Sequence, residues 1–255
     1  MIQSIKKHQF LLEELVKRDF KRKYKGAMFG MAWSIFNPLL MLLIMKVVFS
    51  HFFAGDIEHY TTYLFCGNII FTFFSESTSE GMLALQGNAE IFTKVNVPKY
   101  LFLISKNTQT FLNFALTVLV FFVLCLFDGI TFSFRFLLLL YPILMLLIFN
   151  MGAGLILSAL YVFFRDMRYL WTVAMQIIMY VSAVFYSVDT FPEYAQKLFY
   201  LNPLFLFITY FRKIVLDNTV PSFGFHLIIA FYSLLALVIG ILIYKKNDTE
   251  FLYYV

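Results

Sequence analysis

Charged residues are scarce in this sequence. Asp, Glu, Lys and Arg make up 14% of the 255 residues, whereas about a quarter is usual for a soluble globular domain. Hydrophobic residues make up 61% and aromatic residues 20%. This balance excludes an ordinary soluble domain and indicates an integral membrane protein. We expect a single all-α transmembrane domain over residues 1–255.

The signatures of several enzyme classes are also missing. The sequence has no G-x-x-x-x-G-K-[ST] to bind a nucleotide through a P-loop and no G-x-S-x-G nucleophile motif. Its four histidines lack the spacing of a metal site. We therefore expect no catalytic residue, metal or cofactor in this chain, and no nucleic acid partner. Cys66 and Cys125 fall in apolar stretches, which favours buried thiols over a disulfide.

Six apolar segments are candidate membrane spans. They are residues 31–53, 60–75, 108–127, 136–164, 169–186 and 225–244. An even number of spans puts both termini on one side of the membrane. Fifteen of the 20 Lys and Arg residues then lie on that side and four on the other. The positive-inside rule therefore predicts cytoplasmic N- and C-termini, with residues 245–255 as a cytoplasmic tail.

Residues 1–29 are predicted to form an amphipathic helix in the membrane interface. One face carries basic residues at helical spacing, namely Arg18, Lys21, Arg22 and Lys25. Another face carries an apolar stripe, namely Leu12, Val16, Phe20 and Tyr24. Glu13 and Glu14 are spaced to pair with Lys17 and Arg18. Gly26 and Gly30 would then let the chain turn into a span whose one formal charge is Lys46.

Two connections between spans are predicted to hold short helices. Residues 89–100 mix apolar and polar side chains over about two turns and end near Pro98, as expected of a helix lying across the base of the bundle. Residues 187–224 start helices at Thr190, as a cap, and at Asn202-Pro203. Because neither of these helices reaches ~20 residues, we expect a pair that dips into the outer leaflet.

Three motifs carry a family resemblance. Residues 18–26 (R-D-F-K-R-K-Y-K-G) followed by residues 30–39 (G-M-A-W-S-I-F-N-P-L) resemble the opening of the polysaccharide and polyol-phosphate export permeases. These are the type 2 class of ABC transporter membrane subunits. F-R-D-M at 164–167 and L-N-P-L at 201–204 are similar to later signatures of that family, in matching order. The resemblance covers essentially the whole chain, and residues 27–29 depart from the family pattern.

The resemblance implies a homodimeric half-transporter in the bacterial cytoplasmic (inner) membrane. Its partners would be a second copy of itself and two copies of a separate ABC ATPase, which holds ATP and Mg. A coupling helix in the loop after the second span would dock on that ATPase through Glu90, Phe92, Lys94, Val95, Pro98 and Lys99. The N-terminal helix would act as a gate. Spans one and five would line a channel, here with the aromatic residues Trp33, Phe36, Phe49, Phe52, Phe53, Tyr180, Phe185 and Tyr186.

The family's substrates are glycans on undecaprenyl diphosphate or polyol phosphates on a related lipid. Basic side chains at the inner leaflet would capture the diphosphate, and arginine can bind it bidentately. The candidates are Lys17, Arg18, Lys21, Arg22, Lys23 and Lys25. The alternatives stay open: a basic face that only anchors on anionic lipid, a teichoic acid exporter, and a type 2 exporter of a small lipid or drug. An integral membrane transferase would need a polar catalytic cluster, which is not evident.

Overall fold

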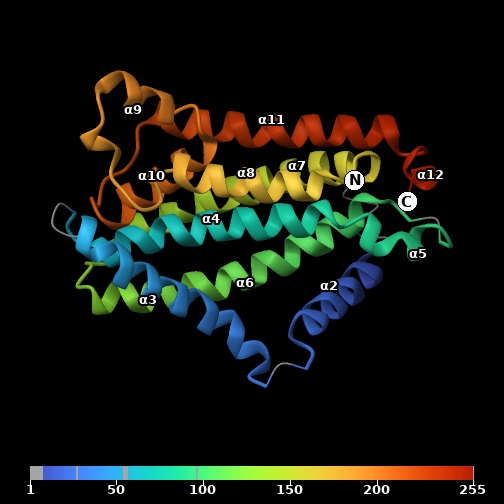
Figure 1. Ribbon diagram of the computed structural model, residues 1–255, viewed down its shortest axis with the longest axis horizontal. Coiled ribbons are helices and arrows are strands. Elements are labelled where there is room, and N and C mark those ends of the chain that lie inside the picture. Colours follow the sequence, from blue (N-terminus) through green and yellow to red (C-terminus); the bar gives the residue numbers. More distant parts are fainter. Residues whose placement is uncertain (1–7, 27, 54–56, 96, 255) are drawn as a thin grey trace.

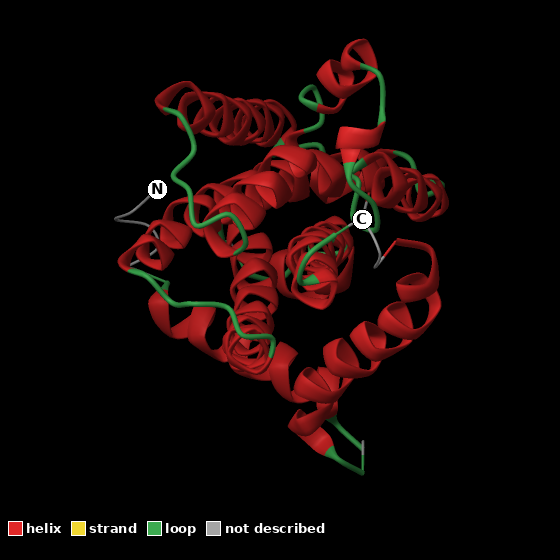
Figure 2. Cartoon of the chain, turned by 90° about the vertical axis from the view of Figure 1, so that its left-hand side faces the viewer, coloured by secondary structure: helices red, strands yellow, loops and turns green. Residues whose placement is uncertain are grey.

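A computed structural model describes residues 8–26, 28–53, 57–95 and 97–254 of the chain. Every regular element within these residues is a helix, so the predicted all-α membrane fold is confirmed. The long helices run roughly alongside one another in one elongated bundle (Figure 1), which Figure 2 shows along its long axis. The described part of the chain begins and ends at the same end of the bundle (Figure 1).

Six long helices correspond in order to the six predicted spans. They are α3 (Trp33–Phe53), α4 (Tyr60–Met82), α6 (Tyr100–Phe127), α7 (Leu140–Phe163), α8 (Met167–Val181) and α11 (Phe223–Asn247). By length and apolarity alone, three helices of the described residues could cross a membrane: α6, α11, and α7 taken with the preceding turn η3 (Phe134–Leu139). A fourth is possible if the bent pair α9 (Glu193–Phe199) and α10 (Pro203–Val215) counts as one span. The count of six spans stays a prediction.

Two predicted boundaries are wrong. Helix α6 begins at Tyr100 rather than at residue 108, because its first turns are held in the core by the buried side chains of Leu101 and Phe102. Helix α8 ends at Val181 rather than at residue 186. Ala183 has a left-handed backbone with φ of 50°, which the helix cannot continue through. Elsewhere the observed helices begin or end within a few residues of the predicted spans, and α4 runs on past residue 75 as expected.

Helices α7 and α11 pack along each other through glycines. A Cβ atom at Gly152 would lie 2.4 Å from the carbonyl carbon of Ala236, and one at Gly240 would lie 2.7 Å from the Cβ of Leu155. Only hydrogen can occupy these positions. Small residues that let two backbones approach closely are a common means of helix association in membranes. This contact therefore depends on the two glycines.

The N-terminal segment leaves the bundle and returns to it. Helix α2 (Gln9–Tyr24) and α3 form a V whose apex lies at the lower edge of Figure 1. The turn between them contains Gly26 with φ of 81° and Gly30 with φ of 49°, which confirms the predicted change of direction. Pro38 lies inside α3 without ending it, as expected.

The cysteines and the C-terminal tail complete the core. Cys66 and Cys125 are buried free thiols, as predicted. Within the predicted tail of residues 245–255, α11 continues to Asn247 and is followed by the single-turn helix α12 (Phe251–Tyr254). Phe251 is fully buried, with its ring centroid 5.2 Å from that of Tyr244 and 5.9 Å from that of Phe163. Its burial holds α12 against α7 and α11.

Candidate functional site

Helix α2, which the sequence predicts to lie in the membrane interface, packs against α6. Leu15 and Asp19 are its buried residues, whereas Leu12, Val16 and Phe20 of the predicted stripe are half-buried. The side chain of Tyr24 lies outside the described part. The Asp19 carboxylate accepts a hydrogen bond from Arg18, and its other oxygen lies 3.5 Å from Nζ of Lys106 on α6. Two cations thus compensate the buried charge, which is why an acidic residue can face inward.

Arg18 is committed to contacts within the protein. Its Nη2 donates to Oδ1 of Asp19 and to Oδ1 of Asn88, each at 2.7 Å. Asn88 closes the turn η2 (Gln86–Asn88), far along the chain. Lys17 pairs with Glu14 at 3.0 Å, and this hydrogen bond raises the pKa of the Lys17 ammonium. Neither Glu13–Lys17 nor Glu14–Arg18, the predicted pairs, is the one formed.

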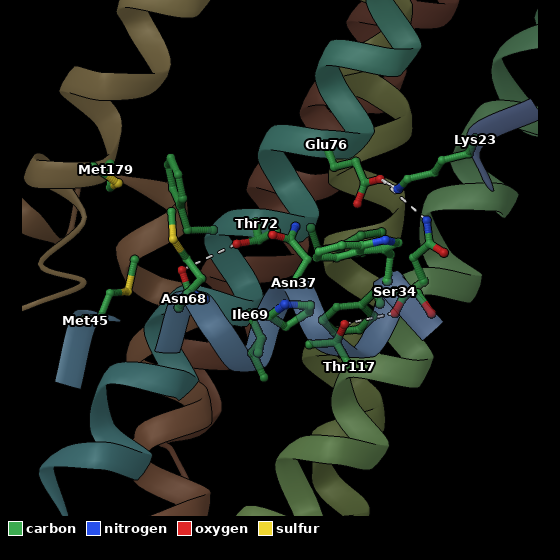
Figure 3. Close-up of a pocket in the computed structure, with 17 residues that line it drawn as sticks. Lys23, Ser34, Asn37, Met45, Asn68, Ile69, Thr72, Glu76, Thr117 and Met179 are labelled. Carbon is green, nitrogen blue, oxygen red and sulfur yellow. Dashed lines mark hydrogen bonds and ion pairs between the residues drawn. The ribbon is translucent and has the colours of Figure 1, made fainter. Parts of the chain in front are cut away.

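The remaining basic residues of this segment differ in their availability. Lys23 forms an ion pair with Glu76 of α4 (Figure 3). Lys21, Arg22 and Lys25 are exposed, and within the described residues they make no ion pair. Three of the six predicted anion-binding residues are therefore free to meet a ligand without breaking a contact seen in the structure. We call Lys21, Arg22 and Lys25 the free basic group.

A cavity of about 440 Å³ lies beside the Lys23–Glu76 pair (Figure 3). Most of its surface is apolar, and we call it the polar cavity after the amide, hydroxyl and carboxylate groups that interrupt its walls. Its walls come from α3, α4 and α6, with Lys23 contributed by α2 and Met179 by α8. Asn68, Thr72 and Glu76 line it from α4 at a spacing of four residues, and Thr72 donates to Oδ1 of Asn68 at 3.5 Å. Polar side chains that face the interior of a membrane bundle often mark functional pathways.

The opposite wall of the polar cavity has the same character. Asn113 and Thr117 line it from α6, also four residues apart. Asn113 Nδ2 lies 3.5 Å from Oε1 of Glu76, which links the two walls. Sequence reasoning missed this cavity. The available signal was the repeat of polar residues at helical spacing within two otherwise apolar segments.

The predicted channel aromatics fall into different environments. Trp33, Phe36 and Tyr180 are exposed on the protomer at 40%, 44% and 58%, and Trp33 also borders the polar cavity. The rings of Trp33 and Phe36 pack edge-to-face on that of Phe29. In contrast, the loop that follows α8 holds Phe185, which is buried, and Tyr186, which is half-buried. The side chains of Phe49, Phe52 and Phe53 lie outside the described part.

The predicted coupling helix is shorter than expected. It is a single turn, α5 (Ala89–Phe92), rather than two turns over residues 90–99. Phe92 is buried, with its ring 5.9 Å from that of Phe102, so this residue anchors the turn. Glu90, Lys94 and Val95 are exposed and Pro98 is half-buried. Lys99 is buried, and its Nζ donates to Oδ1 of Asp248 at 2.9 Å, so it points toward the end of α11.

The two short helices predicted at the other end of the bundle are confirmed. Helices α9 and α10 meet at an angle of 101°, and the side chain of Asn202 accepts a hydrogen bond from the backbone of Leu204 to start α10. The proposed cap at Thr190 is wrong: this residue lies in the turn η4 (Val188–Thr190), and Pro192 precedes α9.

A buried arginine fastens this pair to the bundle. Arg212 of α10 donates to the carbonyl oxygens of Ala183 and Val184 at 3.0 and 2.9 Å. Its guanidinium carbon lies 3.4 Å from the ring centroid of Tyr63 on α4. Tyr60 also donates to the carbonyl of Phe185. The loop after α8 is thus held by side chains from α4 and α10.

Comparisons with known proteins agree with this architecture. The chain is similar to O-antigen export system permease protein RfbA of Klebsiella pneumoniae (27% identical over 243 residues, 94% of this chain and 93% of the relative). It is also similar to the protein of that name in Myxococcus xanthus (24% over 253 residues, 98% and 97%). The polysialic acid transport protein KpsM of Escherichia coli is 23% identical over 245 residues, 94% and 95% of the two chains. Residues 11–216 match the model of the ABC-2 type transporter family, and the chain therefore belongs to this family of transporter membrane subunits.

Proposed function

We propose that this chain is the membrane subunit of an ATP-driven exporter that moves a lipid-linked polysaccharide from the inner to the outer face of the bacterial cytoplasmic membrane. The names of its relatives, which refer to O-antigen export and polysialic acid transport, support a polysaccharide as the cargo. The carrier is inferred to be undecaprenyl diphosphate. The subunit works as a homodimer with two ATPase subunits, and both termini face the cytoplasm.

The observation that carries this proposal is the position of the free basic group. Lys21, Arg22 and Lys25 lie at the end of α2 next to the turn into α3. Directly after the turn, the exposed rings of Phe29, Trp33 and Phe36 pack together. A diphosphate on the cations would put the first sugar within reach of these aromatic faces. Arginine and lysine bind phosphate through charge-assisted hydrogen bonds, which are stronger than those between neutral groups.

Three of the predicted capture residues have a changed role in this proposal. Arg18 and Lys23 position α2 through Asp19, Asn88 and Glu76. Lys17 is compensated by Glu14. These residues contribute to the positive potential near the inner leaflet, whereas the free basic group contacts the diphosphate.

The partner ATPase would bind ATP with Mg and supply the energy of transport. Its movement would act on the exposed side chains of Glu90, Lys94 and Val95, while the buried Phe92 transmits the displacement to α6 through Phe102. The Arg18–Asn88 hydrogen bond connects the same segment to α2. A movement at α5 would thereby reach the helix that carries the free basic group. No covalent bond of the cargo changes in this subunit.

The decisive experiment measures ATP hydrolysis by the purified complex in lipid nanodiscs. The complex receives an undecaprenyl diphosphate-linked glycan, a polyol-phosphate precursor of teichoic acid, or a small amphiphile. Stimulation by the glycolipid alone is the expected result. Stimulation by the polyol phosphate would make the protein a teichoic acid exporter, and a response to the amphiphile alone would make it an exporter of small lipids or drugs.

A second set of variants tests the free basic group itself. Replacing Lys21, Arg22 and Lys25 together by Glu should abolish stimulation by the glycolipid while the complex still assembles. The matched comparison is Arg22→Glu against Lys197→Glu, because Lys197 is an exposed basic residue on α9, outside this group. Only the first of these single variants should weaken stimulation. Equal responses from both would contradict capture of the diphosphate by this group.

A further inference from the structure

A second cavity, of about 600 Å³, lies between α6, α7 and α11, which are long and apolar enough to cross a membrane. Its walls are formed by Leu103 of α6, Met151 and Leu155 of α7, and Leu237 and Ile241 of α11. None of its lining residues comes from α3 or α8, the helices proposed to line the channel. We call it the apolar cavity after these five inner side chains, and it is separate from the polar cavity and from the proposed path of the glycan.

The mouth of the apolar cavity is basic. Lys99, Lys245 and His8 line it together with one carboxylate, that of Asp248. Lys99 is bound to Asp248, through Nζ to Oδ1 at 2.9 Å. Lys245 is exposed, and no ion pair occupies it within the described part of the chain. The mouth thus keeps a net positive charge after its one carboxylate is paired.

The cavity has the depth expected of a lipid site. Lys245 and Leu237 are eight residues apart on α11, which is ~12 Å along a helix axis. Half of a hydrocarbon core is ~15 Å thick, by the usual thickness of the whole. Lys245 belongs to the last turn of α11, where that span would leave the hydrocarbon. A molecule with its head at Lys245 would therefore keep its tail within one leaflet.

We propose that the apolar cavity binds one acyl chain of an anionic phospholipid, whose phosphate lies against Lys245 at the mouth. A lysine near a membrane surface attracts anionic lipid by ~1 kcal/mol. The acyl chain contacts α6, α7 and α11 at once and so braces the start of α6 against the end of α11. The start of α6 follows directly after the segment proposed to couple to the ATPase. The site goes beyond the export function and does not depend on the identity of the cargo.

Native mass spectrometry of the purified protein tests the headgroup contact. The protein is released from nanodiscs with equal amounts of phosphatidylglycerol and phosphatidylcholine, without ATPase or glycan. We expect preferential retention of phosphatidylglycerol, and a roughly fivefold loss of that preference in Lys245→Gln, the ratio that corresponds to ~1 kcal/mol. Lys246→Gln is the matched control, because Lys246 is equally exposed but does not line the cavity. An equal loss in both variants would indicate general attraction to the surface and overturn the site.

A second pair of variants tests the acyl contact. Ile241→Trp fills the apolar cavity and should abolish retention of both lipids, whereas Leu242→Trp should leave it unchanged, because Leu242 is 60% exposed and lies outside the cavity. Retention unaffected by Ile241→Trp would show that the tail binds elsewhere. If that variant fails to fold, the lysine pair still decides the question. Because the lipid measurement uses no glycan, a negative result would leave the proposed export function unaffected. A negative result in the ATP hydrolysis experiment would likewise leave the lipid site unaffected.

Discussion

Arg18 of α2 and Asn88 of η2 are joined by a hydrogen bond of 2.7 Å between Nη2 and Oδ1. The two residues are 70 positions apart, and each also makes a hydrogen bond within its own segment of the chain. Arg18 also binds Asp19, and Asn88 donates to the carbonyl of Ala84 at 2.8 Å. The N-terminal helix and the segment proposed to couple to the ATPase are therefore connected by one charge-assisted contact.

A double-mutant cycle measures this connection. We expect a coupling energy of about 1 kcal/mol between Arg18→Met and Asn88→Ala in the free energy of unfolding. A hydrogen bond to a charged group contributes more than this when it is well shielded from water. The Arg18 side chain is 39% exposed, and water weakens its interactions. The measurement is denaturant unfolding of the purified protein. If the two effects simply add, the contact does not join the segments energetically.

Lys23 and Glu76 should be exchangeable as a pair. Their ion pair joins α2 to α4 at the polar cavity, so Lys23→Glu and Glu76→Lys should each strongly reduce glycolipid-stimulated ATP hydrolysis through like-charge repulsion. The double variant should recover most of it. The control is Lys21→Glu. Because Lys21 does not line the polar cavity, adding Glu76→Lys to this variant should restore no ATP hydrolysis. Failure of the exchange to restore activity would mean that the orientation of the pair, or Glu76 itself, is required.

Local rules explain the parts of the fold that the sequence predicted. Asn202-Pro203 starts α10 because the Asn side chain accepts the free N–H of Leu204 and proline suits the first turn. Gly26 and Gly30 tolerate positive φ and so mark the turn before α3. The start of α10 and the turn before α3 each depend on a few residues that are neighbours in the sequence. The family motifs depend on order along the chain, and they predicted the family correctly.

The missed features depend on residues far apart in the sequence. Asp19 faces inward because Lys106 lies on the helix against which α2 packs, and no spacing within α2 reveals this. Helix α8 stops early because Arg212 holds the carbonyls of Ala183 and Val184, about 30 positions before it in the chain. The polar cavity likewise requires that α4 and α6 turn their polar faces toward each other. Such pairings are tertiary and cannot be obtained from periodicity alone.

Gly152 should not tolerate a side chain. In Gly152→Ala the new Cβ would meet the backbone of α11 at Ala236, which cannot move aside as a flexible side chain would. Overpacking of this kind costs ~1–3 kcal/mol. Gly224→Ala is the control within a helix, because nothing lies within 4 Å of its Cβ position. Thermal unfolding of the purified variants should show a lower midpoint for Gly152→Ala alone, and equal midpoints would refute the close contact of α7 and α11.

The order of stability among variants at Arg212 and Tyr63 tests the clamp on the loop after α8. Arg212→Met leaves the buried carbonyls of Ala183 and Val184 without their donor, and each unpaired buried group costs ~1–3 kcal/mol. We expect a total loss of about 3 kcal/mol in the free energy of unfolding. Arg212→Lys keeps the charge but cannot reach two carbonyls with a planar fork, so its loss should be intermediate.

Tyr63→Phe keeps the ring under the guanidinium and removes the hydroxyl, which donates to the carbonyl of Tyr186. It should therefore lose no more than about 1 kcal/mol, the usual net contribution of one hydrogen bond. Denaturant unfolding of the three variants supplies the comparison. If Tyr63→Phe were as damaging as Arg212→Met, the phenol rather than the guanidinium would hold the loop.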